Sequence, residues 1–419
     1  MLIANGSARP RRGGRLLLLI STAYIAITLN IQGFVGMMPL VRAEFQISAA
    51  RAGLYTSFYF LSATALAVFV GRIVDRLGSR RGLGIGTAAV GAMMLLHAVT
   101  PAYTLILSLA FLTGIGFSLI TPSAGRAVVE NFESNRRASV MGVIHGVGGS
   151  GALLGAAVMP ALGAAYGWRA VLVATGLVAL IISTIIFRLY TPLTNQTEAI
   201  DFHASPASRP SAARPNSLRV DLQALLSNRR FTTVCILGTG FGMALSSATA
   251  HMALFLHQDL GYSPAAAGLG LSGLHIGGIL GHPSWGAAND RLLKGRRIRG
   301  LILLAVCISA MVLFFALIGA QKLLPVPAVL AAAIALGFCV LGQPSQYLTA
   351  LAELSPREHT GLATGVGVVF SRSGMVVAPP VFGLVSDLTG GYTLSWAILG
   401  IVVLAITLVA WILTHRYEP

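Results

Sequence analysis

The sequence predicts an all-α membrane protein whose twelve transmembrane helices form two pseudo-symmetric six-helix bundles. Three observations support this fold class. Hydrophobic residues make up 55% of the 419 residues and charged residues only 10%, which is more apolar surface than a soluble core of this length buries. Twelve apolar stretches have the roughly 20 residues that a helix needs to cross a hydrocarbon core about 30 Å thick. A charged turn also occurs twice, half a chain apart, as a duplicated bundle predicts.

The predicted spans follow one another with short connections. They are expected at residues 16–38, 49–71, 82–100, 104–127, 138–160, 168–188, 231–256, 265–287, 299–320, 326–350, 360–384 and 394–414. An even number of spans places both chain ends on one side of the membrane, and 24 of the 29 Lys and Arg residues lie on that side. Because Lys and Arg concentrate in cytoplasmic connections, we expect a multi-pass protein of the cytoplasmic (inner) membrane with both termini in the cytoplasm.

We expect an N-terminal six-helix bundle, a cytoplasmic linker and a C-terminal six-helix bundle at residues 1–189, 190–228 and 229–419. The linker is rich in Ser, Pro, Ala, Asn and Thr, and Pro206, Pro210 and Pro215 oppose regular structure within it. Leucines at helical spacing follow within residues 217–228, so we expect an amphipathic helix along the membrane surface there.

A short charged turn follows the second predicted span. Its sequence, Gly-Arg-Ile-Val-Asp-Arg-Leu-Gly-Ser-Arg-Arg at residues 71–81, contains four arginines and one aspartate. Its glycines permit a tight reversal, and its arginines hold the turn on the cytoplasmic side. A degraded copy at residues 286–297 places its Asp-Arg pair 215 residues after that of the first turn.

A second internal echo links the fifth and eleventh spans. The fifth span contains Gly142, Ser150 and Gly151. At an offset of 223 residues, these correspond to Gly365, Ser373 and Gly374 in the eleventh span. Small residues in apolar helices let helix backbones approach closely in lipid. Together with the duplicated turn, this echo favours two homologous six-helix halves.

The pattern Gly-x-x-x-Asp-Arg-x-Gly-x-Arg-Arg after the second span resembles the loop between helices 2 and 3 of the major facilitator superfamily. The resemblance implies two bundles around a central cavity that opens alternately to each side of the membrane. It also implies a conformational latch in which Asp75 caps helix 11 and pairs with a basic residue at the end of helix 4, here Arg126. The implied latch residues are Gly71, Asp75, Arg76, Gly78, Arg80, Arg81, Arg126, Asp290 and Arg291.

Two further segments resemble the branch of this superfamily that contains cyanate-type and organic-anion permeases. They are Gly-Trp-Arg at residues 167–169, after a glycine-rich fifth span, and Pro-Pro-x-x-Gly-x-x-x-Asp at residues 379–387. The Gly-Pro pair usual in antiporters is absent from the fifth span, which disfavours efflux. Ala110 occupies the position at which many proton-coupled members carry an arginine.

Charges within the predicted spans bear on the substrate. All 13 acidic residues lie in connections or at helix ends, and a buried cationic substrate requires a carboxylate partner, so cation transport is disfavoured. Arg372 lies about twelve residues into the eleventh span, where an arginine costs roughly 2.5–3.5 kcal/mol on insertion scales. Backbone carbonyls, cavity water or an anionic substrate on the guanidinium could offset that cost. A substrate contact and a structural role therefore both remain open.

Other polar residues of the spans are further candidates. Besides Arg372, the candidates for substrate contact are Asn30, Gln32, Tyr59, His275, Gln343, Gln346 and Tyr347. Histidine titrates near neutral pH and can carry a proton, so His145, His251 and His275 are candidates for proton coupling. A histidine on an apolar helix is also a common packing residue, and both interpretations stay open.

The preferred hypothesis is a secondary active transporter, a permease or symporter, that moves a small organic anion by alternating access, with proton coupling left open. The alternatives are proton-driven efflux of hydrophobic compounds and a non-transporting membrane sensor. A Walker nucleotide-binding motif is absent, because the two lysines, Lys294 and Lys322, are followed by Gly and Leu. We expect no enzymatic activity, no cofactor, no metal and no nucleic-acid partner. We expect a monomer whose partners are the lipid bilayer and a small anionic substrate.

Overall fold

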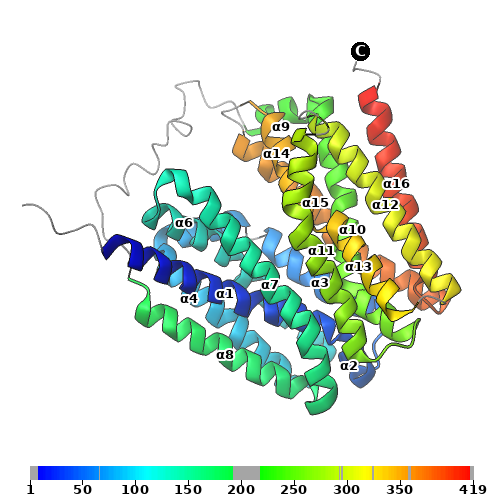
Figure 1. Ribbon diagram of the computed structural model, residues 1–419, viewed down its shortest axis with the longest axis horizontal. Coiled ribbons are helices and arrows are strands. Elements are labelled where there is room, and N and C mark those ends of the chain that lie inside the picture. The colour runs from blue at the N-terminus through cyan, green and yellow to red at the C-terminus, as the bar shows by residue number, and fades with distance from the viewer. Residues whose placement is uncertain are drawn as a thin grey trace, which may run out of the picture. The chain divides into compact units, whose positions relative to one another are not determined.

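A computed structural model of the chain describes residues 8–65, 67–191, 218–291, 293, 296–322, 325–356 and 360–415. Most of the predicted linker, including its three prolines, lies outside these residues. Within them the regular secondary structure is helical and no strand occurs (Figure 1).

The helices of the described chain fall on either side of the linker. Before it lie α1 (Ala8–Gly36), α2 (Met38–Phe45), α3 (Ala49–Ala65), α4 (Ala67–Val99), α5 (Tyr103–Ser118), α6 (Ile120–Asn131), α7 (Ser134–Tyr166) and α8 (Trp168–Leu189). After it lie α9 (Leu218–Ser227), α10 (Arg229–Gln258), α11 (Pro264–Arg291), α12 (Arg297–Gln321), α13 (Val326–Val340), α14 (Pro344–Glu353), α15 (Thr360–Thr389) and α16 (Thr393–His415). The short helix α9 occupies the segment where a surface helix was predicted, and its place on the membrane stays a prediction.

Eleven segments of the described chain are long and apolar enough to cross a membrane. The remaining predicted span, the second, is supplied by the 17 residues of α3 together with the start of α4. α4 is interrupted at Gly78, and its later part forms the third span. The fourth and tenth spans are each divided into two helices, α5 with α6 and α13 with α14. The predicted all-α fold with twelve spans is confirmed.

The chain groups by proximity into two compact units. Unit 1 comprises Met1–Ser48, Leu54–Leu193 and Leu256–His275, and unit 2 comprises Ala49–Gly53, Thr194–Phe255 and Ile276–Pro419. Each unit takes most of its residues from one half of the chain and a short segment from the other. The division into bundles at the linker stays a prediction.

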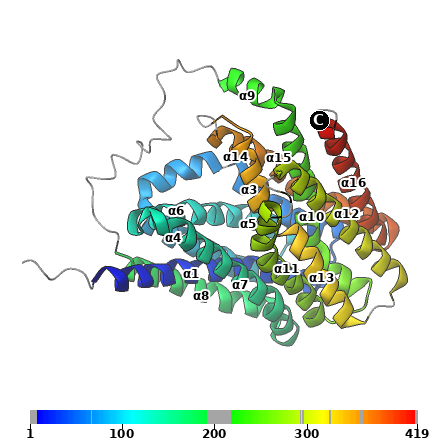
Figure 2. The ribbon, with the colours of Figure 1, turned by 45° about the horizontal axis from the view of Figure 1, so that its top comes forward.

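The glycine echo of the sequence marks equivalent packing contacts in the two units. In unit 1, α1 packs along α7 (Figure 2), and a side chain at Gly151 of α7 would collide with the carbonyl oxygen of Ile25 in α1. In unit 2, a side chain at Gly374 of α15 would collide with the carbonyl oxygen of Thr239 in α10. The first span of each half thus meets the fifth span of the same half backbone to backbone, a contact that small residues permit in lipid.

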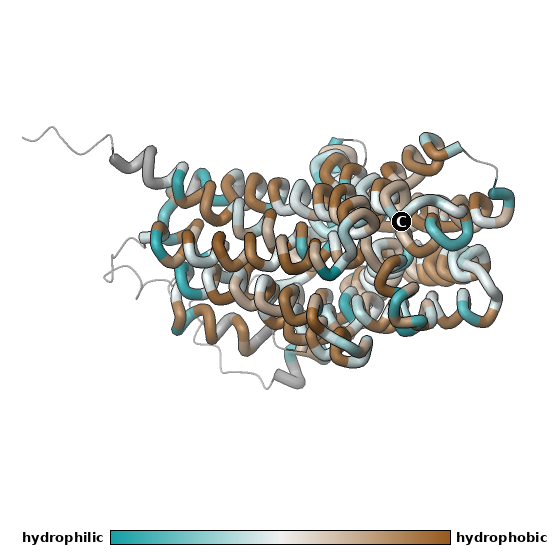
Figure 3. Tube along the Cα trace, turned by 90° about the horizontal axis from the view of Figure 1, so that it is seen from below, coloured by the Kyte–Doolittle hydropathy of each residue, from teal (hydrophilic) through white to brown (hydrophobic). Residues whose placement is uncertain are grey.

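The outer surfaces of the helices are apolar. Hydrophobic residues fill the middle of most helices, and hydrophilic residues concentrate towards the helix ends (Figure 3). On α8 and α16, Ile181 and Ile401 are each 58% exposed. Such surfaces are unfavourable in water and suit the acyl chains of a bilayer.

Candidate functional site

The charged turn at residues 71–81 is built around one glycine. Gly78 interrupts α4 with φ 79° and ψ 164°, a backbone conformation that is essentially restricted to glycine. The chain is helical on both sides of it. The reversal between the second and third spans therefore depends on the residue type at this position.

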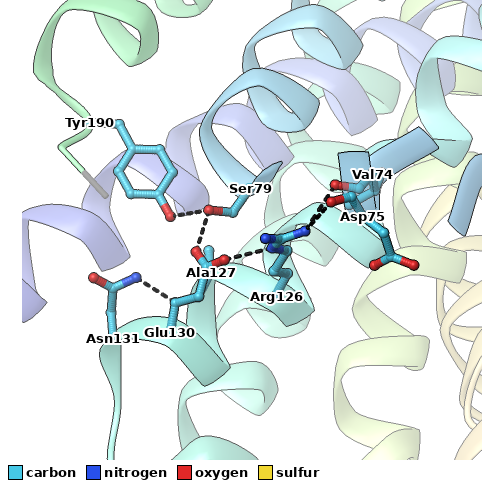
Figure 4. Close-up of polar contacts among 8 residues, drawn as sticks. All are labelled: Val74, Asp75, Ser79, Arg126, Ala127, Glu130, Asn131 and Tyr190. Carbon is cyan, nitrogen blue, oxygen red and sulfur yellow. Dashed lines mark hydrogen bonds and ion pairs between the residues drawn. The ribbon is translucent and has the colours of Figure 1, made fainter. Parts of the chain in front are cut away.

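An arginine of α6 holds the turn from the side (Figure 4). Arg126 donates through Nη1 to the carbonyl oxygens of Val74 (3.2 Å) and Asp75 (2.8 Å). Its Nε lies 2.6 Å from Oε1 of Glu130, one helical turn further along α6. The guanidinium thus joins the end of the second span to the end of the fourth.

Glu130 extends these contacts to two further elements (Figure 4). Its Oε2 accepts a 2.6 Å hydrogen bond from Oγ of Ser79, and that hydroxyl lies 2.6 Å from Oη of Tyr190, which follows α8. Burial raises the pKa of Tyr190 to about 12, a shift that the hydrogen bond with Ser79 opposes. The phenol is therefore protonated at neutral pH. We call Ser79, Arg126, Glu130 and Tyr190 the first loop cluster.

The carboxylate of Asp75 takes no part in this cluster. It is exposed and points away from Arg126 (Figure 4). Arg126 contacts Asp75 only through the main chain. Arg76 and Arg81 are exposed, and Arg80 donates to the carbonyl oxygen of Phe187. Capping of the eleventh helix by Asp75 stays a prediction.

The duplicated turn in the second half is held by a different arginine. Arg297, the first residue of α12, lies 2.7 Å from Oδ1 of Asp290 through Nη1. Its Nε lies 3.2 Å from each carboxylate oxygen of Glu353, at the end of α14. The side chains of Asp290 and Glu353 are 61% and 50% exposed, and Arg291 is exposed as well. We call Asp290, Arg297 and Glu353 the second loop cluster.

Sequence reasoning gave no contact role to Glu130 or Glu353, although both stand at the centre of these clusters. The two glutamates are 223 residues apart, the same offset as the glycine echo of the fifth and eleventh spans. The internal repeat therefore contained a signal for both. The contact between Ser79 and Tyr190 had no such signal, because it joins residues 111 positions apart that the internal repeat does not relate.

Three predicted interior residues of unit 1 have polar atoms that are buried without a partner among the described residues. Asn30 donates through Nδ2 to the carbonyl oxygen of Ala26 at 2.8 Å, but its Oδ1 has no such partner. The same holds for Oε1 of Gln32 and Nε2 of His275. A buried polar atom without a hydrogen-bond partner destabilises the folded protein. Water or a ligand could therefore supply the missing hydrogen bonds of these three atoms.

Two other predicted residues of unit 1 lie among aromatic rings. His145 stands edge-on to Tyr24, with ring centroids 5.7 Å apart, and Tyr24 donates to Oγ1 of Thr121 at 3.3 Å. Tyr59 is buried, with its ring centroid 5.6 Å from that of Phe117. These positions are compatible with packing and do not bring the two residues together.

In unit 2, three predicted residues are engaged by main-chain groups. Tyr347 donates to the carbonyl oxygen of Gly367 at 2.7 Å, and Nε2 of His251 lies 2.8 Å from the carbonyl oxygen of Pro379. Gln346 donates to the carbonyl oxygen of Trp285. Such contacts tie helices together and favour a structural part for each of these side chains.

Arg372 and Gln343 are the remaining predicted residues of unit 2. Arg372 is half-buried and is the thirteenth of the 30 residues of α15. It follows Ser371, whose carbonyl oxygen would collide with a side chain at Gly242 of α10. Gln343 is 2% exposed, and its Oε1 has no partner among the described residues. In the described part of the chain, no group of His, Cys, Asp and Glu side chains could hold a metal ion.

The Gly-Trp-Arg segment anchors the short helix α2 within unit 1. Trp168 donates through Nε1 to Oε2 of Glu44 at 2.6 Å, and Nη2 of Arg169 lies 2.7 Å from Oε1 of the same carboxylate. Burial opposes the ionisation of Glu44, but the bonds from Arg169 and Trp168 outweigh it and lower its pKa. Trp168 and Arg169 of the Gly-Trp-Arg segment therefore have a structural role, which is to hold α2 through Glu44.

The Pro-Pro segment performs a similar task within unit 2. The carboxylate of Asp387 accepts hydrogen bonds from the main-chain nitrogens of Ala49 (2.7 Å) and Ala50 (2.8 Å). It therefore caps the N-terminus of α3, where carboxylates are stabilised by the free N–H groups and the helix dipole.

Comparison with known proteins bears on the identity of the chain. A family model described as Major Facilitator Superfamily matches residues 20–324. Two solved structures share the fold. A bacterial homologue of the human lysosomal transporter Spinster has a TM-score of 0.74 at 16% identity, over 99% of this chain and 100% of that one. A mutant form of the nucleoside transporter NupG has a TM-score of 0.73 at 13% identity, over 96% and 100%.

Three curated relatives have names that point to different compounds. The chloramphenicol resistance protein CraA of Acinetobacter baumannii is 27% identical, over 62% of this chain and only 60% of its own length. The probable sulfoacetate transporter SauU of Cupriavidus necator is 23% identical over 86% and 84%. The 4-hydroxybenzoate transporter PcaK of Pseudomonas putida is 26% identical over 80% and 76%.

Proposed function

This chain belongs to the Major Facilitator Superfamily, and we propose that this membrane transporter moves a small organic anion across the cytoplasmic membrane by alternating access. The substrate class, the direction and the coupling are our proposal. The observation behind it is the position of Arg372.

Arg372 is the one Lys or Arg that the described chain places in the middle of a span. It lies 12 residues after the start of α15, or about 18 Å along the helix axis. The described carboxylates all lie at helix ends or in connections. A guanidinium presents a planar fork of donors that fits a carboxylate with two hydrogen bonds. We therefore assign to Arg372 the contact with the negative charge of the substrate.

Two of the relatives support an anionic substrate. By their names, SauU is a probable sulfoacetate transporter and PcaK is a 4-hydroxybenzoate transporter, and both compounds are negatively charged at neutral pH. At 23% and 26% identity they favour the chemical class and select neither compound.

We test this assignment with Arg372→Lys and Arg372→Ala in purified protein. Hydrogen bonds to a charged group contribute about 1.5–3 kcal/mol, so Arg372→Ala should weaken anion binding roughly 10- to 100-fold and Arg372→Lys by less. Binding is measured by thermal shift and by counterflow in proteoliposomes, against a panel of carboxylates and sulfonates. Arg188→Ala, at an exposed arginine near the end of α8, is the matched control and should bind as the wild type does. Unchanged affinity in Arg372→Ala with a lowered melting temperature would assign Arg372 a structural role.

We further propose that the anion enters together with a proton and that His275 is the first candidate for its carrier. His275 is 6% exposed, and its Nε2 has no partner among the described residues. His275→Gln should abolish uptake driven by a pH gradient and leave counterflow intact. Loss of both activities, or of neither, would exclude this role.

Efflux of hydrophobic compounds is the second candidate, and the similarity to CraA favours it. The two functions differ in direction and in the need for Arg372. An exporter would lower the accumulation of chloramphenicol in cells, and Arg372→Ala would leave that effect unchanged. A membrane sensor, the third candidate, would show no flux in either direction.

We place both termini in the cytoplasm because of the arginine distribution. Gln223 on α9 and Gln321 at the end of α12 are both exposed, and this topology places them on opposite sides. A membrane-impermeant maleimide added to intact cells should label Gln321→Cys and spare Gln223→Cys. The reverse pattern would invert the topology.

A further inference from the structure

Helices α12 and α16 of unit 2 run side by side (Figures 1 and 2). Residues of both helices line an open groove. Its volume is about 620 Å³. The two helices share the lining, which runs from Ile298 to Val306 on α12 and from Leu404 to Thr414 on α16. Because both helices are membrane spans, the groove opens where lipid surrounds the protein.

The groove is about as long as one leaflet of a bilayer is deep. Its lining spans nine residues of α12 and eleven of α16, and the distance from the first residue to the last corresponds to about 12–15 Å of helix. A leaflet contributes half of a hydrocarbon core about 30 Å thick. The groove begins near the start of α12 and the end of α16, so it lies within the leaflet on that side.

The two threonine hydroxyls in the lining of the groove already donate to main-chain oxygens. The hydroxyl of Thr407 donates to the carbonyl oxygen of Val403 at 2.7 Å, and that of Thr414 donates to the carbonyl oxygen of Ala410 at 2.9 Å. Both threonine hydroxyls thus donate to main-chain oxygens of their own helix, and leucines such as Leu404 make much of the rest of the lining apolar. An acyl chain fits this chemistry, and a polar solute does not.

The outer end of the groove is positively charged. Arg299 lines the groove and is exposed, as is Arg296 at the start of α12. Arg297 between them is committed to Asp290 and Glu353. The N-terminus of α12 adds the positive end of its helix dipole. Trp411 also lines the groove near this end, and tryptophan prefers the headgroup level of a bilayer.

We propose that the groove between α12 and α16 binds one anionic phospholipid, with an acyl chain along its apolar lining and the phosphate at Arg299. The negative headgroup matches the charge at the rim, so the site selects an anionic lipid over a zwitterionic one. The site is independent of the transported substrate. In the proposed topology the lipid belongs to the cytoplasmic leaflet.

The test uses the purified full-length chain. The protein is delipidated in mild detergent and mixed with phosphatidylglycerol and phosphatidylcholine of identical acyl chains, and the lipid retained is counted by native mass spectrometry. We expect one phosphatidylglycerol per protein, retained in preference to phosphatidylcholine. Arg299→Gln should weaken this retention about fivefold, the effect of one basic residue at an anionic surface, and Arg299→Lys should preserve it.

Two further variants separate the groove from general surface charge. Leu404→Trp fills the apolar lining and should reduce retention of the lipid without changing the charge. Arg188→Gln removes an exposed arginine near the end of another span and should have no effect. Equal retention of both lipids by the wild type would overturn the proposal even if no variant folds. Equal losses of lipid retention in Arg188→Gln and Arg299→Gln would overturn it as well. So would a dimer that retains no lipid, because a second copy of the chain would then cover the groove.

Discussion

The two copies of the charged turn occupy equivalent places in the repeat but are held by different chemistry. In the first loop cluster, Arg126 and Glu130 come from the same helix, and Ser79 and Tyr190 are almost fully buried. In the second, Arg297 reaches from α12 to two carboxylates whose side chains are at least half exposed. The comparison teaches that the repeat retained the glutamate position and the reversal of the chain, while the arginine that binds the glutamate comes from a different helix in each half.

The largest expected effect concerns the backbone of the two turns. Gly78 has φ 79°, whereas Leu293, the residue 215 positions later, is not among the described residues with a positive φ. A Cβ at Gly78 would meet no atom within 4 Å, so the cost of Gly78→Ala is backbone strain, about 1–3 kcal/mol. The melting temperature of the purified variant should fall by several degrees. Leu293→Ala is the control, and an equal fall there would remove this difference between the turns.

The next largest effect concerns the two glutamates. Glu130→Gln removes the ion pair with Arg126 and weakens the bond from Ser79, and we expect a loss of about 1–2 kcal/mol. Glu353→Gln breaks a half-exposed contact with Arg297 and should cost only about 0.2–1 kcal/mol. Melting temperatures of both variants, each combined with Ala at its arginine in a double-mutant cycle, measure the two couplings. A larger coupling in the second cluster would reverse the comparison.

A smaller, functional effect separates the two aspartates. Because the carboxylate of Asp75 is exposed and points away from Arg126, Asp75→Asn should leave the melting temperature unchanged. If that carboxylate caps the eleventh helix in another conformation, its loss shifts the equilibrium by about 0.3–1 kcal/mol, roughly two- to fivefold in population. Initial transport rates should fall accordingly. Asp290→Asn should behave in the opposite way, with a small loss of stability and a wild-type rate. Wild-type transport by Asp75→Asn would exclude the latch.

The smallest effect appears only at alkaline pH. Burial raises the pKa of Tyr190 to about 12, above the value of about 10 for an unfolded tyrosine. Its contribution to stability is therefore complete below about pH 10 and is lost as the pH rises from about 10 to about 12. The second loop cluster contains no tyrosine. Tyr190→Phe should flatten this part of the stability profile, measured as melting temperature against pH. An unaltered profile would assign the alkaline loss to other groups.

The fold was predictable because its signals are local. Apolar runs of the right length and the bias of arginine placement are visible in short windows of sequence. The division of the fourth and tenth spans was not predicted, although each second helix has a proline near its start, Pro122 in α6 and Pro344 in α14. Proline lacks the N–H that a continuous helix requires. That signal was available but is masked by the high hydropathy around it.

The candidate site was predictable only in part. The motif located the turn and its glycine, and it named Arg126 as a contact of Asp75. It did not reveal that the contact uses the main chain of Asp75, because carbonyl oxygens have no sequence signature. Nor did it reveal the link from Ser79 to Tyr190, which depends on how α4 and α8 pack.

The cap of α3 imposes an order on biosynthesis. Ala49 and Ala50 bond to a carboxylate 338 and 337 residues further along the chain. A ribosome has therefore translated the eleventh span before the start of the second span can receive its cap. Until then, water accepts the hydrogen bonds of these two N–H groups at the membrane surface. A chain truncated before Asp387 lacks this closing contact, so assembly of the second span is completed only after the eleventh span has been made.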